Sequence, residues 1–594
     1  MNKKIFSYAI ILPLILSSCE GMFDPKEVGE VNDDLMWTIP EMVQGVLYQS
    51  YNAIPSRADT YDSNFLDVAT DNAVTSSIGA GIHRMALGQY TAQSCPLSVW
   101  NSAYEQIQNI NLFLEKGLTE NTQFDTDAAQ DELTKKQLRA EALYLRAWWS
   151  ARLLKYHGGV TADGEALGYV ILDRFIEPEK AADFSWIRRN TYEECVEAIC
   201  NDCDEAAEVL PLRAEGDYYG RATALMAQFL KARVLFLAAC PAYQPKEIVM
   251  LNNGYDYEIV DDTAYKEKWK RAASQAALVI EMSGVTSYPA LAAKDIVDFA
   301  ADPKTPAHFV SRYYFSSNNL ESRHFPPYYY GQALTTPSQN LVDAYPMITN
   351  GFPIDDAAES GYDPANPYAD RDARLAATIY CHGDIFGDSG EAIDVIAGHK
   401  DSEGFISNVS GGSRTGYYLR KHLSSKSSML EPLATSAAAH LYPAMRIAEM
   451  YLDYAEASNE VWGPTAVGTL DGGITVPGSA YDIIRQVRKT SGKIKSDEYI
   501  ETVKDDADSF RKLILNERRL EFAFEDCRFW DLRRRLLPLD ETVRGVVVTE
   551  SGEAVSYSYR DVEKRDMASV GHYYLPIPYN EMKKNSNMVN NIGY

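Results

Sequence analysis

The sequence predicts a mainly α-helical protein in which a tetratricopeptide-like scaffold of paired helices carries a large, irregular, loop-rich lobe. Three observations lead to this fold class. Long segments repeat apolar residues at steps of three and four, and one of these segments carries two apolar stripes. The stretch 285–440 is instead rich in Pro, Gly, Asn and Tyr. With 594 residues, 46% of them hydrophobic, the chain can bury the large core that such an arrangement needs.

The amino terminus has the features of a lipoprotein signal peptide. Two lysines precede an apolar run from Ile5 to Leu16, which is far shorter than the roughly 20 residues of a membrane-spanning helix. The next residues, Leu16-Ser-Ser-Cys19, resemble a lipobox, in which the cysteine receives the lipid. We therefore expect a signal peptide over 1–18 and a polar, lipidated tether over 19–40. The alternative is an ordinary secretory signal with an accidental cysteine.

Helical periodicity is strong in the first half of the chain. Two apolar stripes over 138–156 indicate a helix packed on two sides, and 222–239 is apolar almost all round. Pro241 ends the latter helix, and Gly284 is a natural C-cap for a helix over 265–283. The spacing of these helices does not follow a strict repeat of about 34 residues. Further helices are expected near 41–54, 100–118, 191–209, 442–460, 479–490 and 506–524.

Composition excludes some classes of partner and scaffold. The formal net charge of −27 argues against nucleic acid, whose phosphates need Lys and Arg, and favours neutral or weakly charged ligands. Apart from Cys19 there are seven cysteines, an odd number, so the chain is not a disulfide scaffold. Cys195, Cys200 and Cys203 lie close together in a helical stretch, and we expect ordinary thiols there rather than a metal site. No cofactor is predicted.

The carboxyl-terminal sequence resembles that of the RagB/SusD family. The segment Asn516–Arg533 resembles the signature helix of this family, and Tyr442–Ala457 resembles its "R-aE-l-yAEA" helix. Asn366–Leu375 resembles the family motif "PY-RDPRL", although Ala373 replaces the usual proline. Other matching segments follow the same order along the chain: Arg139–Ala147, Tyr156–Gly159, Pro337–Asp343, Arg485–Arg488, Tyr574–Pro578 and Asn590–Tyr594.

This resemblance implies a fold, a location and a role. SusD-like proteins are surface lipoproteins of Gram-negative bacteria with four tetratricopeptide-type helix pairs and a second, irregular lobe. They form the lid of a SusC-like TonB-dependent outer-membrane transporter, to which they deliver oligosaccharides or, in some members, peptides, and they are not enzymes. The expected organisation is an N-terminal helical region over 41–284, a binding lobe over 285–440 and a C-terminal helical region over 441–594.

The signature segment carries many charges, which we interpret as structural. The pairs Arg518–Glu521 and Glu525–Arg528 are three residues apart, a spacing that places opposite charges side by side on a helix. Together with Glu517 and Asp531 they predict an ion network that fixes the last helix pair. Flanking arginines favour the charged form of a carboxyl group, which is the opposite of what a general acid requires.

Two segments offer the aromatic and planar polar side chains that bind sugars. The predicted glycan-binding residues are Asp71, Asn72, His83, Arg84, Tyr313, Tyr314, Asn318, Asn319, Arg323, His324 and Tyr329. A structural interpretation competes with this one. Residues 308–315 alternate like a strand with Tyr314 buried and Tyr313 exposed, and Asp71 suits a helix cap. Trp100 is expected in the core, because Tyr104 continues its helical face.

Three other functions remain open on the sequence alone. The nearest alternative is a lid of the same kind that captures peptides. A helical glycoside hydrolase would require two carboxylates roughly 5–9.5 Å apart in a cleft. A helical-repeat adaptor would bind a protein partner on its concave face. The sequence contains no H-E-x-x-H, G-x-S-x-G or Walker A motif.

Overall fold

The computed structural model describes residues 33–177, 186–214, 219–252, 256–297, 308–404, 412–552 and 554–594. The expected signal peptide, Cys19 and most of the expected tether lie outside these residues. Within the described part, no helix is long and apolar enough to span a membrane.

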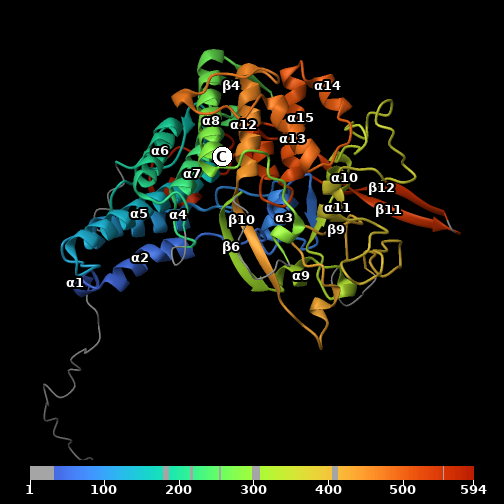
Figure 1. Ribbon diagram of the computed structural model, residues 1–594, viewed down its shortest axis with the longest axis horizontal. Coiled ribbons are helices and arrows are strands. Elements are labelled where there is room, and N and C mark those ends of the chain that lie inside the picture. Colours follow the sequence, from blue (N-terminus) through green and yellow to red (C-terminus); the bar gives the residue numbers. More distant parts are fainter. Residues whose placement is uncertain are drawn as a thin grey trace, which may run out of the picture.

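The scaffold is a series of long helices, each packed against the next (Figure 1). In chain order they are α2 (Pro40–Asn52), α4 (Trp100–Leu112), α5 (Ala128–His157), α6 (Tyr192–Val209), α7 (Ala224–Ala239), α8 (Asp262–Ser283) and α12 (Ile447–Trp462). Next to α12 lie α13 (Ala480–Thr490) and α15 (Ala507–Glu521), with the short helices α14 (Glu498–Val503) and α16 (Arg528–Arg534) beside α15. The predicted helical scaffold is therefore present in the structure.

Local sequence signals explain where several of these helices begin and end. Thr191 and Glu194 form a capping box at the start of α6, in which each side chain accepts from the other residue's backbone N–H. The side chains of Asp127 and Thr223 cap α5 and α7 in the simpler way, each accepting from backbone N–H groups of the first turn. Gly284 ends α8 in the left-handed conformation, with φ of +70°.

The irregular lobe interrupts the scaffold in sequence but not in space. Helices α8 and α12 pack directly against each other, although residues 284–446 separate them in the chain. The described residues of this segment form short helices, loops and paired strands on one side of the scaffold (Figure 1). The short helices are α9 (Asn319–His324), α10 (Gln339–Ala344) and α11 (Ala373–Thr378); α1 (Asp33–Met36), α3 (Gly81–Ala86) and α17 (Tyr579–Lys584) lie elsewhere.

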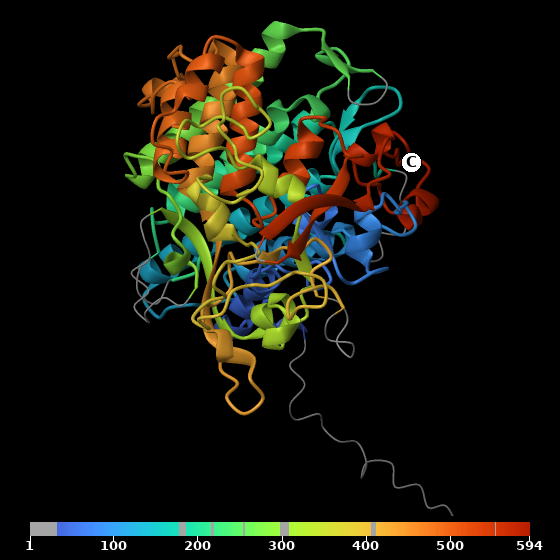
Figure 2. The ribbon, with the colours of Figure 1, turned by 90° about the vertical axis from the view of Figure 1, so that its right-hand side faces the viewer.

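All the strands described pair as antiparallel two-stranded ribbons. The longest are β6 (Phe309–Ser317) with β10 (Ala438–Arg446), and β11 (Thr542–Ser551) with β12 (Ala554–Lys564). The others pair β1 (Ala73–Thr75) with β7 (Thr335–Pro337), β2 (Gly159–Val160) with β3 (Ala166–Leu167), β4 (Val249–Leu251) with β5 (Tyr257–Ile259), and β8 (Ile379–Tyr380) with β9 (Tyr418–Leu419). Figure 2 shows the β11–β12 hairpin on the side of the molecule away from α5 and α6.

The helix expected near 442–460 is wrong at its start, because residues up to Arg446 belong to strand β10. Pro443 has no backbone N–H to donate inside a helix, and the pairing of β10 with β6 shifts register between Tyr442 and Met445. The hairpin β11–β12 was not anticipated, since the whole region after 441 was expected to be helical.

The signature segment joins two hydrophobic cores. Leu513 and Ile514 of α15 are buried in the core of the helical scaffold, whereas Phe524 and Trp530 are buried in the core of the irregular lobe. The chain can pass from one core to the other because it turns sharply after α15, where Phe524 and Asp526 both have positive φ.

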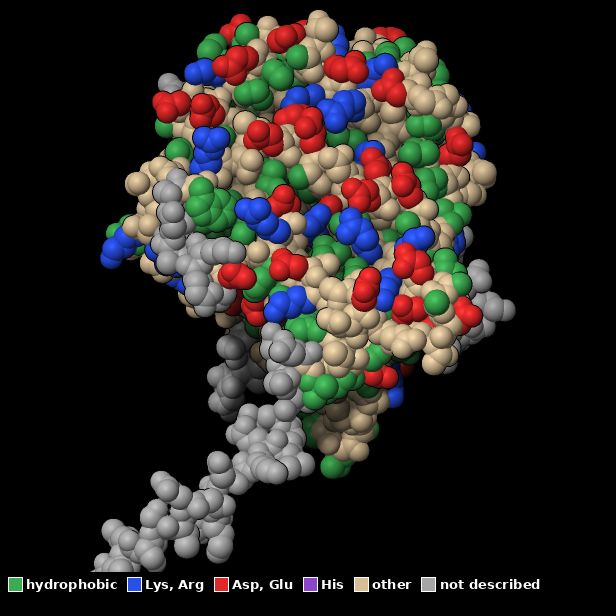
Figure 3. Space-filling model, turned by 90° about the vertical axis from the view of Figure 1, so that its left-hand side faces the viewer, with side chains coloured by type: hydrophobic (Ala, Val, Ile, Leu, Met, Phe, Trp, Pro, Cys, Tyr) green, Lys and Arg blue, Asp and Glu red, His purple; other side chains and the backbone are tan. Residues whose placement is uncertain are grey.

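The surface carries mixed charge. On the face formed by the helices at the left of Figure 1, acidic and basic side chains of the described residues are interspersed, with no broad patch of one sign (Figure 3). This face therefore offers no extended surface of one charge to a partner.

Candidate ligand-binding site

A cavity of about 240 Å³ lies between the scaffold and the β6–β10 ribbon. Helices α5 and α7 form one wall, the ribbon forms the opposite wall, and the turn after α15 closes the third side. Nine aromatic side chains line it: Tyr61, Tyr144, Trp148, Tyr156, Phe236, Tyr313, Tyr442, Phe522 and Trp530. The lining also contains seven Lys or Arg and five Asp or Glu residues. This mixture of aromatic faces and polar groups is typical of a small-molecule site.

Helix α5 supplies a stripe of side chains to the first wall. Trp148, Arg152 and Lys155 are four and three residues apart, so they lie on one face of the helix. The guanidinium of Arg152 lies over the rings of Trp148 and Tyr156, at 5.1 and 5.0 Å from their centres. The ammonium of Lys155 lies 4.8 Å from the centre of the Trp530 ring. Both cations therefore contact aromatic faces within the cavity.

The opposite wall is formed by side chains that the pairing of β6 with β10 places next to each other. Tyr313 and Tyr442 are directly paired across β6 and β10, and their rings lie nearly parallel with centres 6.3 Å apart. Tyr313 is half-buried, and burial raises the pKa of its hydroxyl to about 12. At the end of the cavity, the hydroxyl of Tyr61 lies 3.2 Å from that of Tyr156 and donates to Asp526 at 3.2 Å.

Most carboxylates of the cavity are already paired. Glu449 accepts two hydrogen bonds of 2.6 Å from Arg233, and both oxygens of Glu525 accept from Arg446 or Lys421. Among the described residues, Asp526 has no ion-pair partner, and burial and the nearby Asp67 raise its pKa to about 7. With Glu525 held by two cations, the geometry suits ligand capture better than a pair of catalytic carboxylates.

Several predicted site residues are buried outside this cavity. The carboxylate of Asp71 is paired with Arg519 at 2.9 Å and Arg528 at 2.8 Å, and these arginines hold its pKa below the ordinary value although burial opposes ionisation. Asn72 is fully buried; its amide donates to Asp67, and its oxygen accepts from Arg519 at 2.7 Å. Neither residue has a free surface for a ligand, and Asp71 is not the helix cap considered from the sequence.

The predicted residues His83 and Arg84 are likewise engaged in contacts within the protein. His83 is buried, and its Nε2 lies 3.1 Å from a carboxylate oxygen of Glu563. Arg84 is half-buried and donates to Ser94 at 3.3 Å. Trp100 is buried in the scaffold core, as predicted.

The predicted residues of the second segment divide between cavity, core and surface. Tyr313 lines the cavity, whereas Tyr314 is 55% exposed on the other face of β6. The strand was correctly anticipated, but its faces are reversed, because the Tyr313 side packs toward α7. Asn318 precedes the first turn of α9 and is half-buried, and Asn319 is exposed. These last two residues do not line the cavity.

The remaining three predicted residues are engaged within the irregular lobe. Arg323 forms an ion pair with Asp59. His324 is fully buried against Phe65, and burial followed by the nearby Arg323 lowers its pKa to about 3. Tyr329 is buried and stacks on Phe386, with ring centres 4.2 Å apart. Of the predicted set, only Tyr313 lines the cavity.

The residues that α5 contributes to the cavity were not among those predicted. Trp148, Arg152 and Lys155 lie outside both apolar stripes of this helix, which were interpreted as packing surfaces. An aromatic and basic stripe at this spacing, on a helix already packed on two sides, is the signal that could have revealed them.

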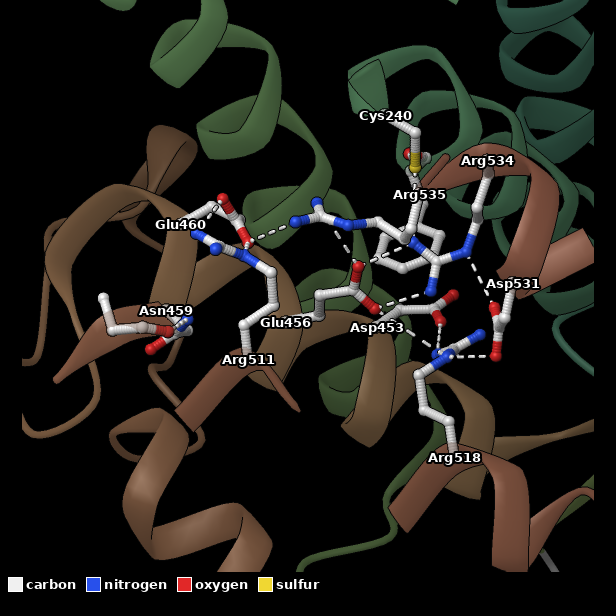
Figure 4. A network of polar contacts seen from close by, with 12 residues as sticks. Cys240, Asp453, Glu456, Asn459, Glu460, Arg511, Arg518, Asp531, Arg534 and Arg535 are labelled. Carbon is white, nitrogen blue, oxygen red and sulfur yellow. Dashed lines mark hydrogen bonds and ion pairs between the residues drawn. The ribbon is translucent and has the colours of Figure 1, made fainter. Parts of the chain in front are cut away.

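The charges of the signature segment form a buried network between α12, α15 and α16 (Figure 4). Asp531 is paired with Arg518 at 3.2 Å and Arg534 at 2.7 Å, and these arginines lower its pKa to about 2 although burial opposes ionisation. Glu456 accepts two hydrogen bonds from Arg534, at 2.6 and 2.7 Å. The predicted structural network is therefore present.

Its pairing differs from the prediction. Arg518 contacts Asp453 and Asp531 rather than Glu521, and Arg528 contacts Asp71 rather than Glu525. Glu525 and Arg528 do not pair because α15 ends at Glu521 and the chain turns before α16 begins at Arg528. Arg518 and Glu521 do share α15, but Glu521 pairs instead with Arg446 of β10. The network links separate elements instead of one helix face.

The three clustered cysteines are buried in α6. Burial raises the pKa of Cys195 and Cys200 to about 12, so both thiols are protonated at neutral pH. Within the described part of the chain, no group of three metal-ligating side chains is present.

Comparisons with known proteins agree with this architecture. A family model described as "SusD family" matches residues 298–594, and one described as "Starch-binding associating with outer membrane" matches residues 30–236. A solved SusD-like protein from Bacteroides fragilis is 23% identical, with a TM-score of 0.69 over 95% of this chain and 98% of that one. The comparison with curated proteins finds no match.

Two further solved structures share the fold. A SusD-like carbohydrate-binding protein from Bacteroides fragilis is 20% identical, with a TM-score of 0.66 over 93% of this chain and 99% of that one. Surface glycan-binding protein A from Bacteroides fluxus is 17% identical, with a TM-score of 0.55 over the same shares. These likenesses confirm the predicted fold class.

Proposed function

The chain belongs to the SusD family, and from this premise we propose that it is a lipid-anchored outer-membrane protein that binds oligosaccharides and delivers them to a SusC-like TonB-dependent transporter. The lipid would be carried by Cys19, and the protein would face the cell exterior. It would act by binding, without catalysis.

The observation that carries this proposal is the aromatic cavity. Its volume of about 240 Å³ is somewhat below the roughly 300–1,000 Å³ of pockets that enclose a whole ligand, so it suits one end of a longer chain. The half-buried ring of Tyr313 offers a face on which an apolar sugar face can stack. The likeness to a Bacteroides fragilis protein that is described as carbohydrate binding supports the same ligand class.

Replacing Tyr313 with alanine should weaken glycan binding by about tenfold, because one stacking face worth roughly 1.4 kcal/mol is lost. A glycan array with the form that lacks residues 1–19 would identify the ligand, and calorimetry would measure both affinities. Tyr314→Ala is the matched control, since this neighbouring ring lies on the opposite face of β6. Equal affinities for the Tyr313 variant and the unaltered protein would remove Tyr313 from the site, and peptide binding in place of glycan binding would refute the proposed cargo.

The proposed partner can be tested by isolation. Membranes solubilised in mild detergent should yield the protein together with a SusC-like transporter, which mass spectrometry would identify. Repeated recovery of the protein alone, under conditions in which its lipid anchor is intact, would contradict a role as the lid of a transporter.

A further inference from the structure

The charges of the cavity are not balanced, although the chain as a whole is strongly acidic. Its lining contains seven Lys or Arg residues but five Asp or Glu residues, against a net charge of −27 for the whole sequence. A local excess of positive charge in such a chain requires a specific explanation.

Most of the lining cations have a partner. Arg233 is paired with Glu449, Arg446 with Glu521 and Glu525, and Arg518 and Arg534 share Asp531; Arg57 lies 3.9 Å from Asp59. Except for the pair within the loop at 57–59, these cations link separate elements of the fold. They leave no charge available for a ligand.

Arg152 and Lys155 differ from these residues. Among the described residues, neither has a carboxylate within ion-pair distance, and their charged groups lie against the rings of Trp148, Tyr156 and Trp530. The Nε of Arg152 is buried and has no hydrogen-bond acceptor in the described part of the chain. Leaving a buried donor without an acceptor costs roughly 1–3 kcal/mol.

The nearby carboxyl group of Asp526 does not neutralise them. It accepts a hydrogen bond from Tyr61 through one oxygen, and its other oxygen is buried without a partner among the described residues. Its pKa of about 7, raised by burial and then by Asp67, leaves it partly protonated at neutral pH. Burial and the nearby Arg233 in turn lower the pKa of Lys155 to about 8. The lowered pKa of Lys155 indicates an ammonium whose burial is not fully compensated by the carboxylates around it.

We propose that this cavity selects acidic sugars, and that Arg152 and Lys155 bind the carboxylate or sulfate of the ligand. This inference rests on the proposed glycan-binding function and specifies its ligand class. A guanidinium presents a planar fork of donors that matches a carboxylate, and the ammonium three residues away adds a second positive group on the same helix face. The surrounding aromatic rings take the apolar faces of the sugar.

The test compares matched ligands on the mature chain. The probes are a trisaccharide of galacturonic acid, the same trisaccharide with methyl-esterified carboxyls, a neutral galactose trisaccharide and a sulfated disaccharide, together with an array of paired acidic and neutral glycans. The acidic member of a pair should bind at least tenfold more tightly than its neutral counterpart. Comparison of the carboxylated and sulfated probes shows which anion the cavity takes.

Substitutions then test whether Arg152 and Lys155 cause this preference for the acidic ligand. Arg152→Gln with Lys155→Gln should abolish the preference, bringing the acidic probe to within about twofold of its ester. Lys136→Gln, which removes an exposed charge of the same helix, is the control and should retain it. Neither Arg152 nor Lys155 has an ion pair to lose within the described part of the chain, so the double variant should remain folded. The lost contacts with Trp148, Tyr156 and Trp530 should lower its melting temperature by only a few degrees.

Three results separate this inference from the function on which it rests. If the array ligands are neutral and their acidic counterparts bind no better, the selection for acidic sugars is wrong and glycan binding stands. If the double variant keeps the preference, the two cations are not its source. If no glycan of either kind binds, both proposals fail.

Discussion

Replacing Glu456 with alanine should lower the free energy of unfolding by about 3–5 kcal/mol. This carboxylate is fully buried in the network of Figure 4, accepts two hydrogen bonds from Arg534, and lies within 4 Å of Arg518 and Arg535. Its removal leaves positive groups buried without their counter-charge. The free energy lost by burying an uncompensated charge is larger than the net free energy that the intact ion pair contributes to folding. Urea unfolding followed by circular dichroism would measure the change.

The control for this experiment is an ion pair at the surface. Glu205→Ala breaks the exposed pair of Arg139 and Glu205, and its effect should stay below about 1 kcal/mol. A second variant tests the cause: Glu456→Leu combined with Arg534→Met removes both charges and should recover much of the lost stability. If Glu456→Ala proved as mild as Glu205→Ala, the network would not contribute to stability in the way described.

Replacing Cys19 with alanine should abolish lipid attachment completely. The resemblance to a lipobox is the reason we propose this sulfur as the site of acylation. A stable anchor requires two or three acyl chains, at about 0.8 kcal/mol per buried methylene. Cells labelled with an alkyne fatty acid should incorporate it into the unaltered protein and not into the variant. Detergent-phase partitioning of the purified mature protein gives a second measurement.

Another cysteine provides the comparison. Cys95→Ala removes a thiol of the folded domain, and this variant should still incorporate the fatty acid. Labelling of the Cys19 variant at the level of the unaltered protein would refute the lipoprotein proposal. It would leave the glycan-binding proposal intact, because the cavity lies in the folded domain.

Periodicity located the long helices well because their burial follows a regular pattern. Helix α7 is buried almost all round, and its sequence is apolar all round. The first ten residues of α5 were missed, because they are polar and mostly exposed, and no apolar stripe marks them. Boundaries that depend on distant partners were also missed. The strand β10 forms because β6 is available to pair with it, which no local pattern reveals.

The site was harder to predict than the fold. Polar and aromatic residues in irregular segments were natural candidates for glycan contacts. Yet His324 is buried against Phe65 and Asn72 accepts a hydrogen bond from Arg519, and both partners are far away in the sequence. The residue types alone do not distinguish a buried hydrogen-bonding role from contact with a ligand. Tyr313 and Tyr314 were both candidates, and only Tyr313 lines the cavity, because a strand places alternate rings on opposite faces. Its contact with a glycan stays a prediction.

The ion pair of Asp71 with Arg528 has a consequence for the order in which the molecule is made. These residues are 457 positions apart, so at a synthesis rate of 5–20 residues per second the earlier one waits roughly 20 to 90 s for its partner. The loop around Asp71 also needs Arg565, which donates to the backbone oxygens of Val68, Thr70 and Ala73. Until the last part of the chain arrives, this segment lacks its native contacts and is open to proteases and to chaperones.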